Sequence, residues 1–242
     1  MGICDGRVVV ITGAGRGIGR AHALAFAAEG ARVVVNDLGA EVDGTGGSTG
    51  PAGEVVDMIR SMGGEAVANG DDVASWEGAA ALVRTALDAF GGLDTLVCNA
   101  GILRDRMLVN MSEEDWDMVM RVHLKGHFCP LRHAGAYWRE ESKAGRPVRG
   151  RVILTSSGAG LYGNVGQLNY GQGGDRHHGA HRRGRTEALR GHGERDRARS
   201  QDAHDRGSVS RDDGGAPARN VRPCGPGERL AARGVAGQRR GG

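Results

Sequence analysis

The sequence predicts one α/β domain built on a parallel β-sheet that helices cover on both faces. Short apolar runs alternate with helical patterns over the first 156 residues, and a glycine-rich turn separates the first run from the first helical pattern. The runs are apolar on both of their faces, as strands buried between two helix layers must be. Strand–helix alternation leads to right-handed crossovers and hence to a doubly wound sheet, and 242 residues suit one such domain.

Five runs rich in Val, Ile and Leu are the predicted strands. They are residues 7–12, 32–37, 66–71, 93–99 and 151–156. No later run has this character, so we expect the sheet to be truncated after its fifth strand.

Four helices are predicted between these strands. They cover residues 17–29, 51 to about 63, 76–90, and 112 to about 142. Pro51 suits the first turn of the second helix, because its missing N–H has no partner there in any case. Ser112 is predicted to cap the fourth helix, and the acidic residues that follow it suit the positive end of the helix dipole. The glycine-rich stretch 39–50 is predicted to be a long loop.

The C-terminal part of the chain differs from the rest in composition. Residues 1–170 carry a net charge of −4, whereas residues 171–242 contain 16 Arg, no Lys and 9 acidic residues. This second segment has no Phe, Trp or Tyr, so it cannot bury enough apolar surface to offset the entropy of ordering it. We therefore predict a domain at residues 1–171 and a disordered, Arg/Gly-rich tail at residues 172–242.

The four cysteines are widely spaced and form no C-x-x-C pair. They are Cys4, Cys98, Cys129 and Cys224. This spacing is not typical of a zinc site or of a disulfide framework, and it favours reduced thiols in the cytoplasm. No apolar run approaches the length of a membrane span, and no signal peptide opens the chain. We expect a cytoplasmic protein with no metal ion and no membrane association.

A glycine-rich turn with the spacing G-x-x-x-G-x-G lies between the first strand and the first helix. It contains Gly13, Gly17 and Gly19, with Arg16 and Ile18 among them. A diphosphate reaches the backbone N–H groups of a helix N-terminus only where no side chain blocks the approach, which favours glycine at these positions. The turn predicts a dinucleotide site in a Rossmann-type fold, although by itself it is also compatible with a plain tight turn.

Asp37 indicates which dinucleotide is bound. It stands at the end of the second predicted strand, where a carboxylate accepts hydrogen bonds from the adenosine ribose hydroxyls and repels a 2′-phosphate. This favours NAD over NADP. Arg16 is an opposing signal, because a basic residue in the turn can meet a 2′-phosphate. Asp72 and Val73 follow the third strand and are candidates for the adenine pocket.

These features coincide with a family resemblance. The chain resembles the short-chain dehydrogenases in the turn at 12–19, in Asn99-Ala100-Gly101 after the fourth strand, and in Ser157 thirteen residues before Tyr170. Within that family it is most similar to the (3R)-hydroxyacyl-CoA dehydrogenase part of peroxisomal multifunctional enzyme type 2 and to bacterial hydroxysteroid dehydrogenases. The stretches that carry this likeness are 35–39, 99–106, 114–117, 122–126, 162–164 and 166–167. The resemblance covers roughly residues 5–171.

The resemblance implies hydride transfer between NAD and a secondary alcohol or ketone, such as an acyl-CoA or a steroid, by a homo-oligomer. In the family a Ser polarises the substrate oxygen and a Tyr is the general acid/base, and these roles fall on Ser157 and Tyr170. A fourth member, usually Asn on the long helix, supports a water relay, and His123 stands at its position. The resemblance also places Asn99, Ala100 and Gly101 at the cofactor.

The family pattern breaks just after Tyr170. The family carries a Lys one helical turn after its Tyr, because a phenol with a pKa near 10 is a poor base at neutral pH without a cation beside it. Gly174 occupies that place here. Nothing after it matches the family's active-site helix, later strands or substrate lid. We therefore predict little or no dehydrogenase activity for this chain and loss of the family's main subunit interface.

A shift of the reading frame would explain the break. Back-translated from Gln172 and shifted by one nucleotide, the segment can encode Lys-Ala-Gly-Ile-Ala-Thr-Met, then a Val-Asn-Ala-Ile strand and a Pro-Gly turn, in the family's order. We hypothesise a frameshift just after Gly171, in the gene or in its sequencing. The nucleotide sequence across the codons for Tyr170 to Gly174 tests this, since an unshifted read excludes it.

Three other readings stay open. The first is a nucleotide-binding remnant without catalysis. The second is a protein that binds polyanions through its Arg-rich tail, and the third is a 3-oxoacyl-carrier-protein reductase. The tail lacks the aromatic side chains on which nucleic-acid bases stack, so we expect no nucleic-acid partner. Asp37 and His123 argue against the reductase, which usually prefers NADP and carries Asn in place of His.

Overall fold

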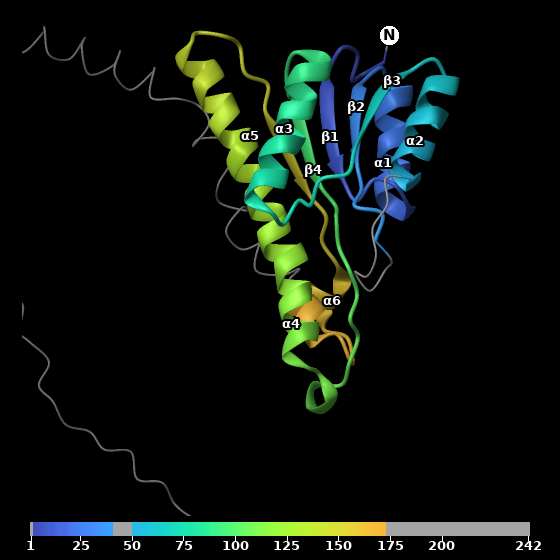
Figure 1. Ribbon diagram of the computed structural model, residues 1–242, viewed down its shortest axis with the longest axis vertical. Helices are drawn as coiled ribbons and strands as arrows, with labels where there is room; N and C mark the ends of the chain where they lie inside the picture. The colour runs from blue at the N-terminus through green and yellow to red at the C-terminus, as the bar shows by residue number, and fades with distance from the viewer. Residues whose placement is uncertain (1, 41–49, 173–242) are drawn as a thin grey trace, which may run out of the picture. The chain divides into compact units, whose positions relative to one another are not determined.

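The structure, a computed structural model, describes residues 2–40 and 50–172 (Figure 1). All of them belong to the first of the two compact units into which the chain divides, Met1–Arg197. The loop predicted at 39–50 falls largely outside the described residues, and so does the tail predicted at 172–242, except for Gln172.

In the part of the chain that the structure describes, five parallel strands form one sheet, which confirms the predicted α/β fold class. They are β1 (Val8–Thr12), β2 (Arg32–Asn36), β3 (Glu65–Asn69), β4 (Thr95–Cys98) and β5 (Arg151–Leu154). Their order across the sheet is β3-β2-β1-β4-β5, so the order reverses between β1 and β4. A ligand crevice is expected where the strand order of a doubly wound sheet reverses, outside the carboxyl ends of the strands.

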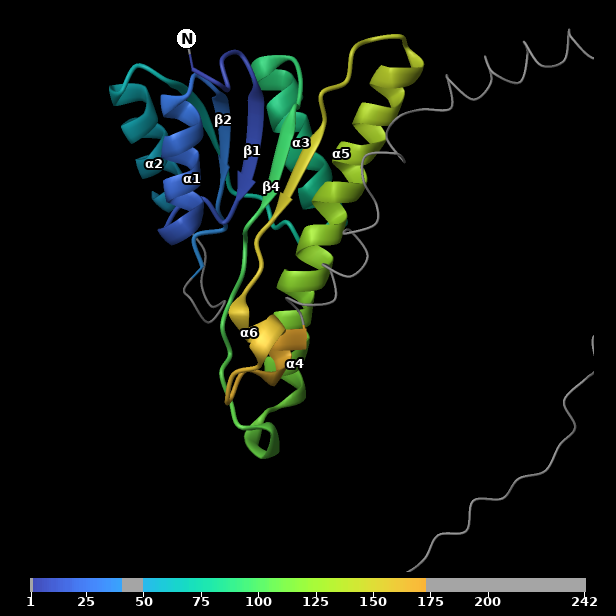
Figure 2. The same cartoon turned by 180° about the vertical axis from the view of Figure 1, so that it is seen from behind.

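Helices cover both faces of this sheet, as Figures 1 and 2 show. On one face lie α1 (Gly17–Ala28) and α2 (Gly50–Ser61), and on the other lie α3 (Trp76–Phe90) and α5 (Gly126–Lys143). Successive side chains of a strand point to opposite faces, and β1 shows this directly. Val9 and Ile11 pack in the core beneath α1 and α2, whereas Val8 and Val10 pack in the core beneath α3 and α5.

The helix ends follow from their capping residues. Ser75 accepts a hydrogen bond from the N–H of Gly78 at the start of α3, and Gly91 ends this helix with a left-handed φ of 75°. Ser112 begins α4 (Glu113–Met120) with a capping box, in which the Ser112 hydroxyl and the Asp115 carboxylate each accept a backbone N–H of the other residue. The predicted cap at Ser112 is therefore confirmed.

The helix predicted from residue 112 to about 142 is observed as a continuous helical run, Glu113 to Lys143, but it is not α-helical throughout. A π-helical turn, Arg121–Lys125, separates α4 from α5. Such turns insert one residue into the helical repeat and occur often at functional sites. Pro130 lies inside α5, where its missing N–H removes a further helical hydrogen bond. Apolar periodicity alone does not reveal where such an insertion falls.

The chain between β5 and residue 172 adds short helical segments beyond the sheet. Helix α6 (Gly158–Tyr162) follows β5, and residues 168–172 are again helical. The segment between them docks on the chain that follows β4, where the N–H of Arg106 donates to the carbonyl of Gly166 and Gln167 donates to the Asp105 carboxylate. None of the helices in residues 2–40 and 50–172 combines the length and the apolar character needed to cross a membrane.

Candidate active site

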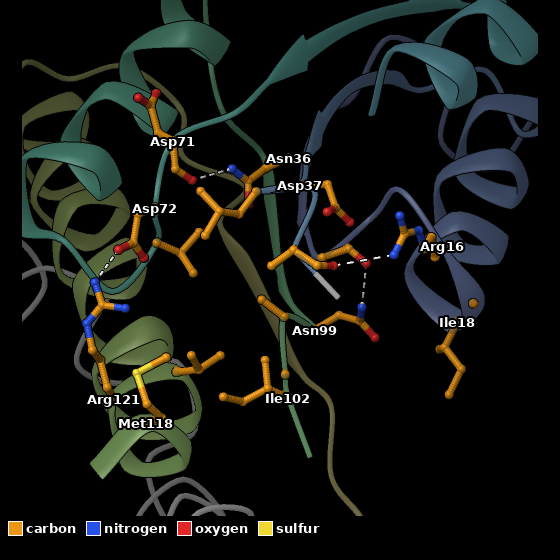
Figure 3. Close-up of a pocket in the computed structure, with 18 residues that line it drawn as sticks. Arg16, Ile18, Asn36, Asp37, Asp71, Asp72, Asn99, Ile102, Met118 and Arg121 are labelled. Carbon is orange, nitrogen blue, oxygen red and sulfur yellow. Dashed lines mark hydrogen bonds and ion pairs between the residues drawn. The ribbon is translucent and has the colours of Figure 1, made fainter. Parts of the chain in front are cut away.

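A cavity of about 330 Å³ opens at the carboxyl ends of the strands, beside the point where the strand order reverses (Figure 3). The ends of β1, β2 and β4, the loop after β3 and the start of the π-helical turn line it. Ten of the eleven residues predicted at the cofactor are among its lining. They are Gly13, Arg16, Gly17, Ile18, Asp37, Asp72, Val73, Asn99, Ala100 and Gly101. Segments far apart in the sequence thus meet at one cavity.

The glycine turn brings the N-terminus of α1 to the cavity. Gly13 and Gly17 have left-handed φ values of 61° and 52°, which side chains rarely adopt. A Cβ at Gly13 would lie 2.7 Å from the Cα of Ala100, whereas a Cβ at Gly17 would meet open space. The first N–H groups of α1 have no partner within the helix and carry the positive end of its dipole, so this turn offers an anion site.

Gly19 lies outside the cavity lining and has a packing role in the structure. A Cβ there would lie 2.1 Å from the carbonyl oxygen of Gly13 and 2.5 Å from the amide nitrogen of Asn99. Since backbone cannot yield as a flexible side chain does, α1 approaches the turn this closely only with glycine at this position.

We expect Gly19→Ala to lower the free energy of unfolding by about 2 kcal/mol, because the added methyl group overlaps backbone. Gly53→Ala is the matched control: Gly53 lies in α2, and a Cβ there would meet nothing within 4 Å. This control should raise stability by about 0.5 kcal/mol, because it lowers the entropy of the unfolded chain. Urea denaturation of both variants measures the difference, and equal effects would contradict the packing role.

The Asp37 carboxylate is oriented by backbone on two sides. It accepts the N–H of Gly15 at 2.8 Å through one oxygen and the N–H of Gly39 at 2.7 Å through the other. A carboxylate has about four acceptor positions, so both oxygens keep capacity toward the cavity that Asp37 lines. Arg16, the other charged residue of this wall, donates to the carbonyl of Ala40 at 3.4 Å.

Asn99 ties the fourth strand to the glycine turn. Its side-chain amide donates to the carbonyl oxygens of Thr12 at 3.2 Å and Gly13 at 3.1 Å. The Thr12 hydroxyl in turn accepts the N–H groups of Asn99 at 2.9 Å and Ala100 at 3.0 Å. These four hydrogen bonds fix the residues after β4 against the glycine turn, so this part of the cavity is formed without a ligand.

His123 lies on the π-helical turn and is buried. Its Nε2 lies 3.1 Å from the N–H nitrogen and 2.9 Å from the carbonyl oxygen of Ile102, so the tautomer decides which of the two it bonds. A Cβ at Gly101 would lie 2.6 Å from the His123 ring, which explains the glycine there. The Tyr170 ring stands nearly perpendicular to the His123 ring, with centroids 5.0 Å apart.

Asn169 fixes the segment that carries Tyr170. Its side chain is fully buried, donates to the carbonyls of Arg104 at 3.1 Å and Asp115 at 3.2 Å, and accepts the N–H of Tyr170 at 2.8 Å. Hydrogen bonding from Ser112, together with the charges of Arg104 and Arg106, holds the pKa of the Asp115 carboxyl below its ordinary value. The charged cluster joins α4 to the chain after β4, and Asn169 bonds both of these elements.

The structure brings two of the three predicted catalytic residues together. Tyr170 contacts His123, whereas Ser157 lies at the start of α6, where its hydroxyl accepts the N–H of Ala159 at 3.2 Å. Within residues 50–172 no hydrogen bond joins Ser157 to Tyr170. Sequence reasoning missed Arg121 and Asn169, because their partners lie far away in the chain.

Comparison with known proteins identifies the family. The family model described as short chain dehydrogenase matches residues 7–173. The chain is 53% identical over 165 residues to a short-chain type dehydrogenase/reductase of Mycobacterium tuberculosis, covering 68% of this chain and 56% of that protein. It is 52% identical over 166 residues to mouse peroxisomal multifunctional enzyme type 2, covering 69% of this chain and 21% of that protein.

Two further relatives agree with this match. A hydroxyacyl-CoA dehydrogenase of Mycobacterium tuberculosis is 49% identical over 172 residues, which cover 69% of this chain and 51% of that protein. The crystal structure of a short chain dehydrogenase from Mycobacterium avium has 64% sequence identity and a TM-score of 0.66, covering 71% of this chain and 59% of that chain. The chain thus spans between about a fifth and three fifths of the length of these relatives. The match of the family model to most of the chain, with these identities, shows that the chain belongs to the short-chain dehydrogenase family.

Proposed function

We propose that residues 1–171 form an NAD-binding dehydrogenase domain that acts on a secondary alcohol or ketone, such as a 3-hydroxyacyl-CoA or a hydroxysteroid. Oxidoreductase chemistry is the shared property of the family to which the chain belongs. The observation that carries the proposal is the cavity in which the N-terminus of α1 and the Asp37 carboxylate lie on one wall. A diphosphate fits the first group and a ribose diol fits the second.

The preference for NAD follows from the charge beside the ribose position. Gly15 and Gly39 orient the Asp37 carboxylate, which accepts hydrogen bonds from ribose hydroxyls but repels a 2′-phosphate. Arg16 attracts a phosphate from the same wall, but its side chain is exposed and already donates to Ala40. A carboxylate held by two backbone N–H groups outweighs an exposed guanidinium, whose charge the solvent screens.

The adenine end fits the loop after β3. An adenine ring presents a donor, its 6-amino group, beside an acceptor, N1. The Asp72 carboxylate is an acceptor, and the neighbouring Val73 backbone N–H is a donor. Both residues line the cavity, so this pair complements the ring edge.

The catalytic step is a proton transfer coupled to the hydride transfer that a bound nicotinamide supplies. Tyr170 donates or accepts the proton at its phenol oxygen, and Ser157 holds the substrate oxygen through its hydroxyl. His123 contacts the Tyr170 ring and bonds the backbone of Ile102, so it connects the phenol to the cavity wall. Gly174 provides no cation one turn after Tyr170, and this is why we propose that the chain as written is impaired.

An apolar surface beside the catalytic residues suits the body of the substrate. Large hydrophobic side chains are exposed on two neighbouring segments, the 3₁₀ turn Leu108–Asn110 with Met107 and the stretch from Leu161 to Leu168. A cavity of about 400 Å³ lies between these segments and reaches Ala159 and Gly171, next to Ser157 and Tyr170. Exposed apolar patches of this kind mark binding surfaces, and an acyl chain or a steroid nucleus is the chemistry that this one fits.

Calorimetric titration with NAD and NADP, followed by NADH absorbance with a 3-hydroxyacyl-CoA and a steroid alcohol, tests the proposal. We expect NAD to bind at least about tenfold more tightly than NADP and turnover to be weak or absent. Binding without turnover by the chain as written, and also by a chain with its reading frame repaired, would instead favour the catalytically inactive remnant. No NAD binding by either chain would exclude the dehydrogenase assignment.

A further inference from the structure

An ion pair crosses one wall of the cavity. The Arg121 guanidinium, on the first residue of the π-helical turn, pairs with the Asp72 carboxylate in the loop after β3 (Figure 3). The two residues are 49 positions apart in the sequence, and both line the cavity. Their side chains are 41% and 27% exposed. Half-exposed pairs of this kind add little to stability, so the effect of this pair lies in the geometry it imposes.

The pair fixes the direction of the carboxylate. One Asp72 oxygen accepts the N–H of Ala74 at 2.8 Å, and the other receives the Arg121 guanidinium. The carboxylate is therefore held from two sides, and its remaining acceptor positions keep one orientation toward the cavity. Without Arg121, the bond to Ala74 is the one that remains among residues 2–40 and 50–172, and the carboxylate can rotate about it.

We propose that Arg121 is a positioning residue that makes the site select adenine, because it orients the Asp72 carboxylate toward the 6-amino group of the base. The inference rests on the proposed NAD site and adds the residue that determines its base specificity. A base with a carbonyl at the same position presents an acceptor to the carboxylate, so two electron-rich oxygens face each other and binding weakens.

The neighbouring residues of the helix fix the position of Arg121. The capping box at Ser112 begins α4, and the π-helical turn that follows this helix carries both Arg121 and His123. His123 is fixed by its bond to the backbone of Ile102. Arg16, the other cation among the described lining residues, lies on the opposite wall and donates to Ala40. It therefore does not orient the Asp72 carboxylate.

Calorimetric titration of the 242-residue chain and its Arg121→Gln variant, each with NAD and with nicotinamide hypoxanthine dinucleotide, tests this proposal. The unmodified chain should prefer NAD by about tenfold, and the variant should lose most of that preference, with NAD binding weakened about tenfold and the hypoxanthine analogue changed less than about threefold. Loss of the positive charge of Arg121 affects the diphosphate of both dinucleotides alike, so this effect cancels in the ratio of the two dissociation constants.

Two further variants complete the experiment. Arg121→Lys keeps the charge and should keep part of the preference for NAD over the hypoxanthine analogue. If the arginine acted only through its shape, this variant would lose that preference. Arg84→Gln removes a charge from the exposed face of α3, away from the cavity, and should change neither dissociation constant.

Each outcome decides the proposal. Equal weakening of both dinucleotides in Arg121→Gln, or an unchanged preference, would overturn it while leaving the NAD site intact. Failure of both the unmodified chain and a chain with its reading frame repaired to bind NAD would overturn the proposed function, and this inference with it. If Arg121→Gln loses its circular dichroism signal, Arg121→Lys decides instead. Its preference for NAD over the hypoxanthine analogue should be smaller than that of the unmodified chain, and an unchanged preference would overturn the proposal.

Discussion

A chain with its reading frame repaired after Gly171 should turn over a 3-hydroxyacyl-CoA or a steroid alcohol at least about a hundredfold faster than the chain as written, since a positioned acid/base contributes about 10²–10⁴-fold. The repair places a Lys one helical turn after Tyr170. Its ammonium stabilises the phenolate form of the general base, which a phenol with an ordinary pKa near 10 reaches poorly at neutral pH. NADH absorbance at equal protein concentration measures both chains.

The control separates the lysine from the rest of the repair. A repaired chain that carries methionine in place of that lysine should fold and bind NAD like the repaired chain, but its turnover should fall back toward that of the chain as written. Robust turnover by the 242-residue chain itself would contradict the predicted impairment. It would show that another group, such as His123, activates the tyrosine.

Asp37→Ala should weaken NAD binding by about thirtyfold or more, because charge-assisted hydrogen bonds to the ribose contribute about 1.5–3 kcal/mol each. NADP binding should change far less, since the same substitution removes the repulsion of the 2′-phosphate. The preference for NAD over NADP should therefore nearly vanish. Calorimetric titration of both dinucleotides gives the two dissociation constants.

Asp57→Ala is the matched control for Asp37→Ala. Asp57 is an exposed carboxylate on α2, outside the cavity lining, and its removal changes the net charge by the same amount. If Asp37→Ala weakened NAD and NADP equally, the carboxylate would be acting on the shape of the turn through Gly15 and Gly39 and not on the ribose.

Sequence reasoning predicted the parts of this molecule that local chemistry determines. Each predicted strand overlaps an observed one, because a strand buried on both faces must be continuously apolar. The third helix has the predicted bounds, Trp76–Phe90, since Ser75 and Gly91 mark its two ends. The glycine turn and Asp37 were predicted because strand–turn–helix spacing brings them to one edge of the sheet.

The features that the sequence did not predict depend on contacts between distant segments. The π-helical turn carries His123, which contacts the backbone of Ile102, and the apolar periodicity of α4 does not predict it. The pairing of Arg121 with Asp72 and the burial of Asn169 under α4 likewise depend on three-dimensional packing. Arg, Asp and Asn are common on exposed surfaces, so the composition of the chain did not predict these contacts.

The docking of the tyrosine segment has a consequence for synthesis of the chain. Asn169 and Gln167 bond this segment to Arg104, Asp105 and Asp115, and these three residues lie more than fifty positions earlier in the chain. A nascent chain can therefore seat Tyr170 against His123 once this segment has left the ribosome, while the codons downstream of it are still being read. The contacts that position Tyr170 are therefore complete before the residues encoded by those codons are needed.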